Sequence, residues 1–74
     1  MRKLQLVINE YVNGDWQNTT DEVLEYIEAR RRAATEATKY NCEVTASFPG
    51  GHKIYTGVKN NATYTIITNV VEEA

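Results

Sequence analysis

The sequence predicts an α+β domain in which one long helix packs on a three- to four-stranded antiparallel sheet, in the order β-α-β-β-β. Apolar residues follow a helical repeat from about Thr20 to Tyr40, and from Cys42 onward they alternate as in a strand. Short segments rich in Gly and Asn then divide the alternating part into separate strands. A chain of 74 residues is enough for a single domain, residues 1–74, with a small core.

Residues 3–11 predict the first strand, because every second residue from Leu4 to Ile8 is apolar. Asn13-Gly14-Asp15 predicts a turn, since Asn and Gly tolerate positive φ. Trp16-Gln17 fits either a short return strand or part of a loop, and the pattern does not decide between the two.

The helix is predicted to begin at a capping box. In Thr19-Thr20-Asp21-Glu22 the Thr19 hydroxyl would accept a hydrogen bond from the amide of Glu22, and the Glu22 side chain would reach back. Acidic residues then precede basic ones along the helix, which matches the helix dipole. Glu28 and Arg32 have the spacing of an i,i+4 ion pair.

One sector of this helix is expected to pack on the sheet. Its residues are Val23, Tyr26, Ile27, Ala33, Ala34, Ala37 and Tyr40. Arg30 falls near the middle of the sector. Its stem is therefore expected to cross the edge of the core, with the guanidinium reaching water or pairing with a carboxylate. Alternatively, Arg30 faces a partner protein or a bound anion.

Three further strands are predicted at residues 42–48, 54–58 and 62–71, with turns at 49–52 and 59–61. Both faces of the last strand carry apolar residues, and a single helix covers one face of a sheet. The second face is therefore expected to be exposed or covered by another chain. The candidates for it are Val7, Tyr11, Tyr55, Ile67 and Val71.

The amino-acid composition argues against several classes of function. A net charge of -2 argues against a protein that binds nucleic acid without regard to sequence, because the negatively charged phosphate backbone requires a basic surface. One cysteine, Cys42, allows no intrachain disulfide, and neither a signal peptide nor a membrane span is evident, so a cytoplasmic protein is expected. With one histidine, His52, and one cysteine, the sequence predicts no catalytic residues, no cofactor and no metal site.

A weak resemblance points to a partner. The run from Glu28 to Ala34, the segment Tyr40-Asn41-Cys42-Glu43-Val44, a Gly-containing turn and Ile54-Tyr55 resemble small phage-encoded β-α-β-β proteins, some of them anti-CRISPR inhibitors. The resemblance implies a non-enzymatic inhibitor of a bacterial host or defence protein. In several such proteins basic residues compete for nucleic-acid-binding surfaces, which here implies Arg30, Arg31, Arg32, Lys53 and Lys59.

The favoured hypothesis is therefore a protein-binding module of the phage-inhibitor type, with two alternatives. One is a structural homo-oligomer that pairs through its sheet. The other is a single-stranded nucleic-acid binder that stacks bases on sheet tyrosines. The candidate partner-binding residues are Arg30, Arg31, Arg32, Tyr11, Tyr55, Tyr64, Lys53 and Lys59.

Overall fold

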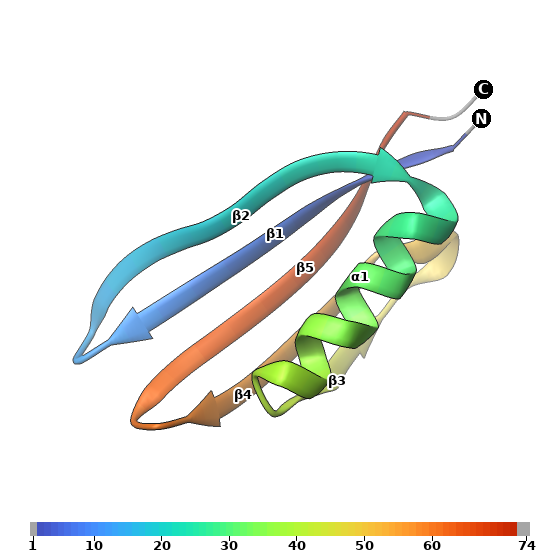
Figure 1. The fold of residues 1–74 in the computed structure, drawn as a ribbon. Coiled ribbons are helices and arrows are strands. Elements are labelled where there is room, and N and C mark those ends of the chain that lie inside the picture. The colour runs from blue at the N-terminus through green and yellow to red at the C-terminus, as the bar shows by residue number, and fades with distance from the viewer. Residues whose placement is uncertain (1, 73–74) are drawn as a thin grey trace.

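The computed structural model describes residues 2–72, which form a five-stranded antiparallel sheet and one α-helix in the order β-β-α-β-β-β (Figure 1). The elements are β1 (Lys3–Val12), β2 (Asp15–Glu25), α1 (Tyr26–Lys39), β3 (Cys42–Ser47), a 3-10 turn (Pro49–Gly51), β4 (Lys53–Lys59) and β5 (Ala62–Glu72). The α+β class is confirmed, while the predicted order β-α-β-β-β lacks one strand.

The first and last strands lie side by side at the centre of the sheet, whose spatial order is β2-β1-β5-β4-β3. On one side, Ile8 of β1 is paired with Ile66 of β5, and Ile66 with Tyr55 of β4. Leu6 is likewise buried on this side. The predicted alternation of residues 3–11 and of the last strand is therefore confirmed, and these residues form the floor of the core.

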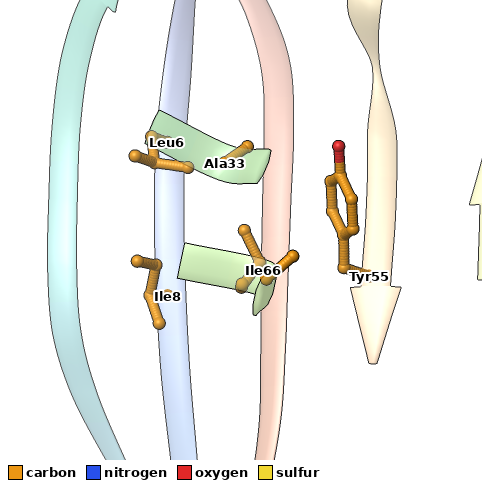
Figure 2. Packing of buried hydrophobic residues seen from close by; sticks show 6 residues of the cluster. Leu6, Ile8, Ala33, Tyr55 and Ile66 are labelled. Atoms are coloured by element: carbon orange, nitrogen blue, oxygen red, sulfur yellow. The ribbon is translucent and has the colours of Figure 1, made fainter. Parts of the chain in front are cut away.

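Helix α1 covers this side of the sheet (Figure 1). It buries Ala29, Ala33 and Ala37, and Ala33 packs in one cluster with Leu6, Ile8 and Ile66 (Figure 2). Because alanine has a single methyl group, the helix axis can approach the strands closely and bury their larger aliphatic side chains.

The opposite side of the sheet carries no α-helix within residues 2–72, and we call it the open face. Away from the two ends of the chain, strand register and side-chain alternation define its members on the inner strands and at the hairpin tip. They are Gln5, Val7, Asn9, Tyr11, Trp16, Ile54, Thr56, Val58, Thr63, Thr65, Ile67 and Asn69. The prediction that Tyr55 lies on this face is wrong. Tyr55 is paired with Ile66 beneath the helix and is 9% exposed.

Strand β2 replaces the predicted first turns of the helix. The Thr19 hydroxyl does not cap a helix but donates to the carbonyl of Ile8 at 3.2 Å. Trp16-Gln17 belongs to a return strand that continues to Glu25 and pairs with β1 along its length. The predicted capping box is therefore wrong, because the ladder with β1, whose register shifts only at Thr19, satisfies more backbone groups than one capping pair does.

The shorter helix changes which residues reach the core. Val23 lies on β2 and is 55% exposed, and Ile27 and Ala34 are also exposed. The buried sector is centred instead on Ala29, Ala33 and Ala37. The predicted ion pair of Glu28 with Arg32 is likewise replaced, since Arg32 pairs with Glu22 of β2 at 3.1 Å.

Tight turns join the remaining elements. Asn13-Gly14 and Asn60-Asn61 have positive φ and close the β1–β2 and β4–β5 hairpins. After α1, Asn41 also has positive φ and leads the chain into β3. Here a Cβ on Gly57 would clash with the Asn41 carbonyl and lie 2.7 Å from the Cα of Cys42, so glycine permits this close approach.

Candidate binding groove

A groove on the helix side of the sheet combines apolar walls with positive charge. It lies between α1 and strand β4 and has a volume of about 500 Å³. Its lining residues are Tyr26, Ile27, Arg30, Arg31, Ala34, Lys53 and Tyr55. We call it the basic groove. Its volume falls within the range of about 300–1,000 Å³ that is usual for sites binding small ligands or a few side chains.

The groove exists because α1 turns its alanines, and not its larger side chains, toward the sheet. Arg30 and Ala34 each follow a buried alanine by one position, so they project about 100° around the helix from it. Lys53 and Tyr55 alternate with Ile54 along β4 and therefore share the helix side of the sheet. The helix and β4 thus supply the two walls.

Tyr26 and Arg30 form a small cluster at one wall of the groove. The Nη1 of Arg30 donates to the hydroxyl of Tyr26 at 3.3 Å, and its Cζ lies 5.5 Å from the centroid of that ring. The Cζ of Arg2 lies 5.2 Å from the same centroid. A cation–π contact of this kind holds the Arg30 side chain along the wall and leaves other guanidinium N–H groups free to donate.

The backbone of β4 is held firmly where Lys53 enters the groove. The amide of Lys53 donates to the Thr68 hydroxyl at 3.1 Å, and that hydroxyl donates to the Gly51 carbonyl at 2.6 Å. Thr68 is 2% exposed. The buried hydroxyl therefore fixes both the turn before β4 and the point from which the Lys53 side chain projects.

The charges of the basic groove have no acidic partner in the part of the chain that the structure describes. Within residues 2–72, no carboxylate lies within ion-pair distance of Arg30, Arg31 or Lys53. Two basic side chains outside the groove do have acidic partners: Arg32 pairs with Glu22, and Lys39 pairs with Glu36 at 3.9 Å. A chain with a net charge of -2 thus gathers three positive charges around one hollow, and none of them forms an ion pair with a carboxylate of residues 2–72.

Four of the predicted partner-binding residues meet in this groove: Arg30, Arg31, Lys53 and Tyr55. The other four lie elsewhere. Arg32 is tied to β2, and the Nζ of Lys59 donates to the Lys39 carbonyl at 2.7 Å at the end of the helix. Tyr11 lies on the open face beside Trp16, and Tyr64 lies beneath the end of α1.

Tyr64 is bound into the interior. It is 8% exposed, its ring stacks on Tyr40 with centroids 4.3 Å apart, and its hydroxyl donates to Oε2 of Glu10 at 2.6 Å. The hydrogen bond to Glu10, burial and the charge of that carboxylate raise the pKa of Tyr64 to about 12. With Tyr55 buried as well, neither tyrosine presents an exposed ring on which a base could stack.

Sequence reasoning missed Tyr26, Ile27 and Ala34 as groove residues, because it assigned all three to the buried sector of the helix. Ile27 is 62% exposed. The available signal was its spacing: Ile27 precedes Arg30 and Arg31 by three and four positions, so the three side chains share one side of a helix. The correct start of the helix was needed to see that this side faces β4.

Residues 2–72 contain no group of three or more His, Cys, Asp or Glu side chains that could hold a metal ion. Cys42 is half-buried beside the carbonyls of Tyr40 and Tyr64, and burial raises the pKa of its thiol. A raised pKa lowers the thiolate fraction and with it the reactivity of the thiol.

His52 contacts Phe48, with ring centroids 5.0 Å apart. In the same described range, no helix has the length and hydropathy needed to cross a membrane. The basic groove and the open face are therefore the two surfaces whose residues suggest binding.

Comparison of this chain with protein-family models, with curated proteins and with solved structures gives no match, so its function has to be inferred from the chemistry of these surfaces.

Proposed function

We propose that this chain is a non-enzymatic protein-binding module that takes an acidic segment of a partner protein in the basic groove. The observation that supports this is the gathering of Arg30, Arg31 and Lys53 around an apolar hollow without a carboxylate among residues 2–72 to pair with them. Carboxylates of a partner would form charge-assisted hydrogen bonds with these groups.

The apolar walls add a second requirement. Ile27 and Ala34 are exposed in the groove and gain from burial against an aliphatic or aromatic side chain. A segment that alternates acidic with large apolar residues satisfies both requirements. The net charge of -2 and the burial of Tyr55 and Tyr64 favour such a peptide over a nucleic-acid strand.

The resemblance to phage-encoded inhibitors would place this partner among bacterial host or defence proteins. The residues that carry the resemblance include Arg30 and Arg31, which line the basic groove. This identity of the partner is part of the proposal and is tested after the chemistry of the groove.

The first test uses a short synthetic peptide that alternates Glu with Leu and Phe, and a matched peptide with Gln in place of Glu. In NMR titrations of the isotope-labelled protein, the Glu peptide is expected to shift the amides of Ile27, Arg31 and Lys53 and to bind more weakly as salt is added. The Gln peptide is expected to bind at least about tenfold more weakly.

Matched variants separate the groove from general charge. Neutralising Arg30 and Arg31 to Gln is expected to weaken binding of the Glu peptide by about tenfold or more. Neutralising Arg32 and Lys39 to Gln makes the same change in net charge outside the groove and is expected to change affinity by less than about twofold. Equal effects of both double variants, no shifts at millimolar peptide, or tighter binding of a single-stranded oligonucleotide would each contradict the proposal.

A further inference from the structure

The centre of the open face is an apolar row that runs across four strands. Val7 is paired with Ile67, Ile67 with Ile54, and Ile54 with Ala46 on β3. All four side chains are half-buried, since each is flanked by its neighbours in the row but covered by no helix of residues 2–72. Val7 and Ile67 were predicted from the sequence, and Ile54 and Ala46 extend the row.

A second apolar group lies on the same face near the hairpin tips. Tyr11 is paired with Trp16 and with Thr63, and Thr63 with Val58. Trp16 is 57% exposed and Val58 is 60% exposed. Between the two groups runs a polar row of short side chains, in which Asn9 donates to the Thr65 hydroxyl at 3.4 Å.

The open face has no charged residue among the members defined above, although the chain has 8 basic and 10 acidic residues. The charged residues of this side lie at its rim: Lys3 at the start of β1, and Asp21 and Glu43, which pair with Val7 and Thr56, on the edge strands. Sheet faces that meet water normally carry Lys, Glu or Arg. An uncharged centre with a charged rim is instead the pattern of an interface.

The size of the open face fits that reading. Five strands about 4.8 Å apart, with central strands rising about 3.3 Å per residue and shorter outer ones, make a surface of roughly 600–800 Å². A stable protein interface buries about 600–1,000 Å² on each partner. The open face alone is therefore large enough to support a dimer.

We propose that two copies of this chain pack back to back through their open faces, giving four layers in the order helix, sheet, sheet, helix. An uncharged surface does not select a partner of opposite charge, but it meets a copy of itself without repulsion. A two-fold axis through the face would oppose the central apolar rows of the two copies, with the sheets about 10 Å apart. This inference does not depend on what the basic groove binds.

Pairing of two β2 edge strands is a competing way to form a dimer, and the charges of β2 oppose it. The strand carries Asp15, Asp21, Glu22 and Glu25 and no Lys or Arg. Antiparallel pairing of two β2 strands would bring these carboxylates near one another, and like charges on facing strands destabilise a ladder. Packing through the open faces keeps the two β2 edges apart.

The back-to-back arrangement leaves both helices outside. Each basic groove then faces solvent on opposite sides of the dimer, so one dimer offers two identical sites. A partner with two acidic segments would gain affinity from the second site without any new contact.

The first measurement is the mass in solution. Light scattering from low micromolar to about 1 mM protein is expected to show a reversible change from the 8.4 kDa chain to twice that mass. A mass that stays at the monomer value across this range would overturn the proposal.

Substitutions then locate the interface. Ile67→Lys at the centre of the open face is expected to weaken dimerisation at least tenfold, because two lysines would be buried at a two-fold interface. Thr65→Lys makes a milder change in the next row and decides the question if Ile67→Lys fails to fold. Thr35→Lys on the exposed side of α1 is the matched control and is expected to leave the dimer unchanged. A dimer that tolerates Thr65→Lys would contradict the proposal.

A distance separates the two dimer geometries. In a dimer that mixes isotope-labelled and unlabelled wild-type chains, back-to-back packing brings the two β5 strands about 10 Å apart, so the methyl groups of Ile67 are expected to give nuclear Overhauser contacts to the partner. Pairing through β2 edges would separate the two β5 strands by five strand spacings, about 24 Å. The contacts between the two chains are expected, and their absence from the dimer would overturn the proposal.

Discussion

Tyr64 contacts residues from two other elements that are far from it in the sequence. It lies on β5, stacks on Tyr40 at the end of α1 and donates to Glu10 of β1. The hydrogen bond satisfies both the phenol and a partly buried carboxylate, so neither polar group is left without a partner in the interior. Tyr64 is therefore a structural residue in this fold.

The raised pKa of Tyr64 predicts a specific alkaline sensitivity. In the folded chain the pKa is about 12, and an unperturbed tyrosine has a pKa of 10.0. The unfolded state therefore releases its proton first as the pH rises, and unfolding becomes easier between these two values. The contribution of this group to stability is fully present below pH 10 and is lost as the pH passes through about 12.

We expect the urea midpoint of the wild type to exceed that of Tyr64→Phe at neutral pH and the difference to shrink between pH 10 and 12. Tyr11→Phe is the control, because Tyr11 lies on the open face and makes no side-chain hydrogen bond recorded within residues 2–72. A difference between wild type and Tyr64→Phe that stays constant with pH would show that the hydrogen bond to Glu10 does not set the pKa.

Individual residues were predictable from the sequence to different degrees. Arg30, Arg31 and Lys53 were selected through the resemblance to phage-encoded inhibitors, and Tyr55 was selected as a candidate for the uncovered face of the sheet. Their meeting in one groove was not predictable, since it depends on where β4 lies relative to the helix. Tyr64 was predicted as an exposed ring and is buried, because the alternation of β5 shows which residues share a face but not which face the helix covers.

At the scale of elements, the prediction failed at β2 for a definable reason. Almost every residue of Asp15–Glu25 is exposed, and only Thr20 and Leu24 are half-buried. An edge strand with so little burial has no hydrophobic period for a sequence pattern to show. Its acidic residues also match the charges favoured at the start of a helix, so the segment resembled a helical turn until its pairing with β1 was known.

Helix α1 begins without a side-chain cap, and a substitution can supply one. Glu25 occupies the N-cap position without a side-chain hydrogen bond to the first turn. Glu25→Ser would place a serine three residues before Glu28 and create a capping box at the real boundary. We expect the variant to raise the free energy of unfolding by about 0.5–1 kcal/mol, measured by urea denaturation.

The control for this change is Glu25→Ala, which removes the same carboxylate without supplying a cap. It is expected to give no increase in stability. If serine and alanine had equal effects, the gain would come from removing negative charge from the β2 edge and not from capping.

At the scale of the whole molecule, cohesion is concentrated at the centre of the sheet. The two strands nearest the chain ends, β1 and β5, pair with each other and lie beneath α1. Strand β2 is attached on one side to β1, and its other edge has no neighbouring strand within residues 2–72. Burial and backbone pairing therefore decrease from β5 and β1 outward to β2, and local stability should follow the same order.

Native-state hydrogen exchange should reveal this gradient. The amides of β5 at Ile66 and Thr68 lie between two neighbouring strands, so exposing them to solvent requires the core to open. We therefore expect these amides to exchange at the rate of global unfolding. Amides of β2 at the Trp16 end pair with the part of β1 that extends past the buried core, and local separation of that hairpin exposes them. We expect them to exchange at least about tenfold faster, measured at low protein concentration so that self-association adds no protection. Equal protection of the two strands would mean that the β1–β2 hairpin unfolds only with the core, and that the exposed Trp16 end is stabilised by something other than its sparse contacts.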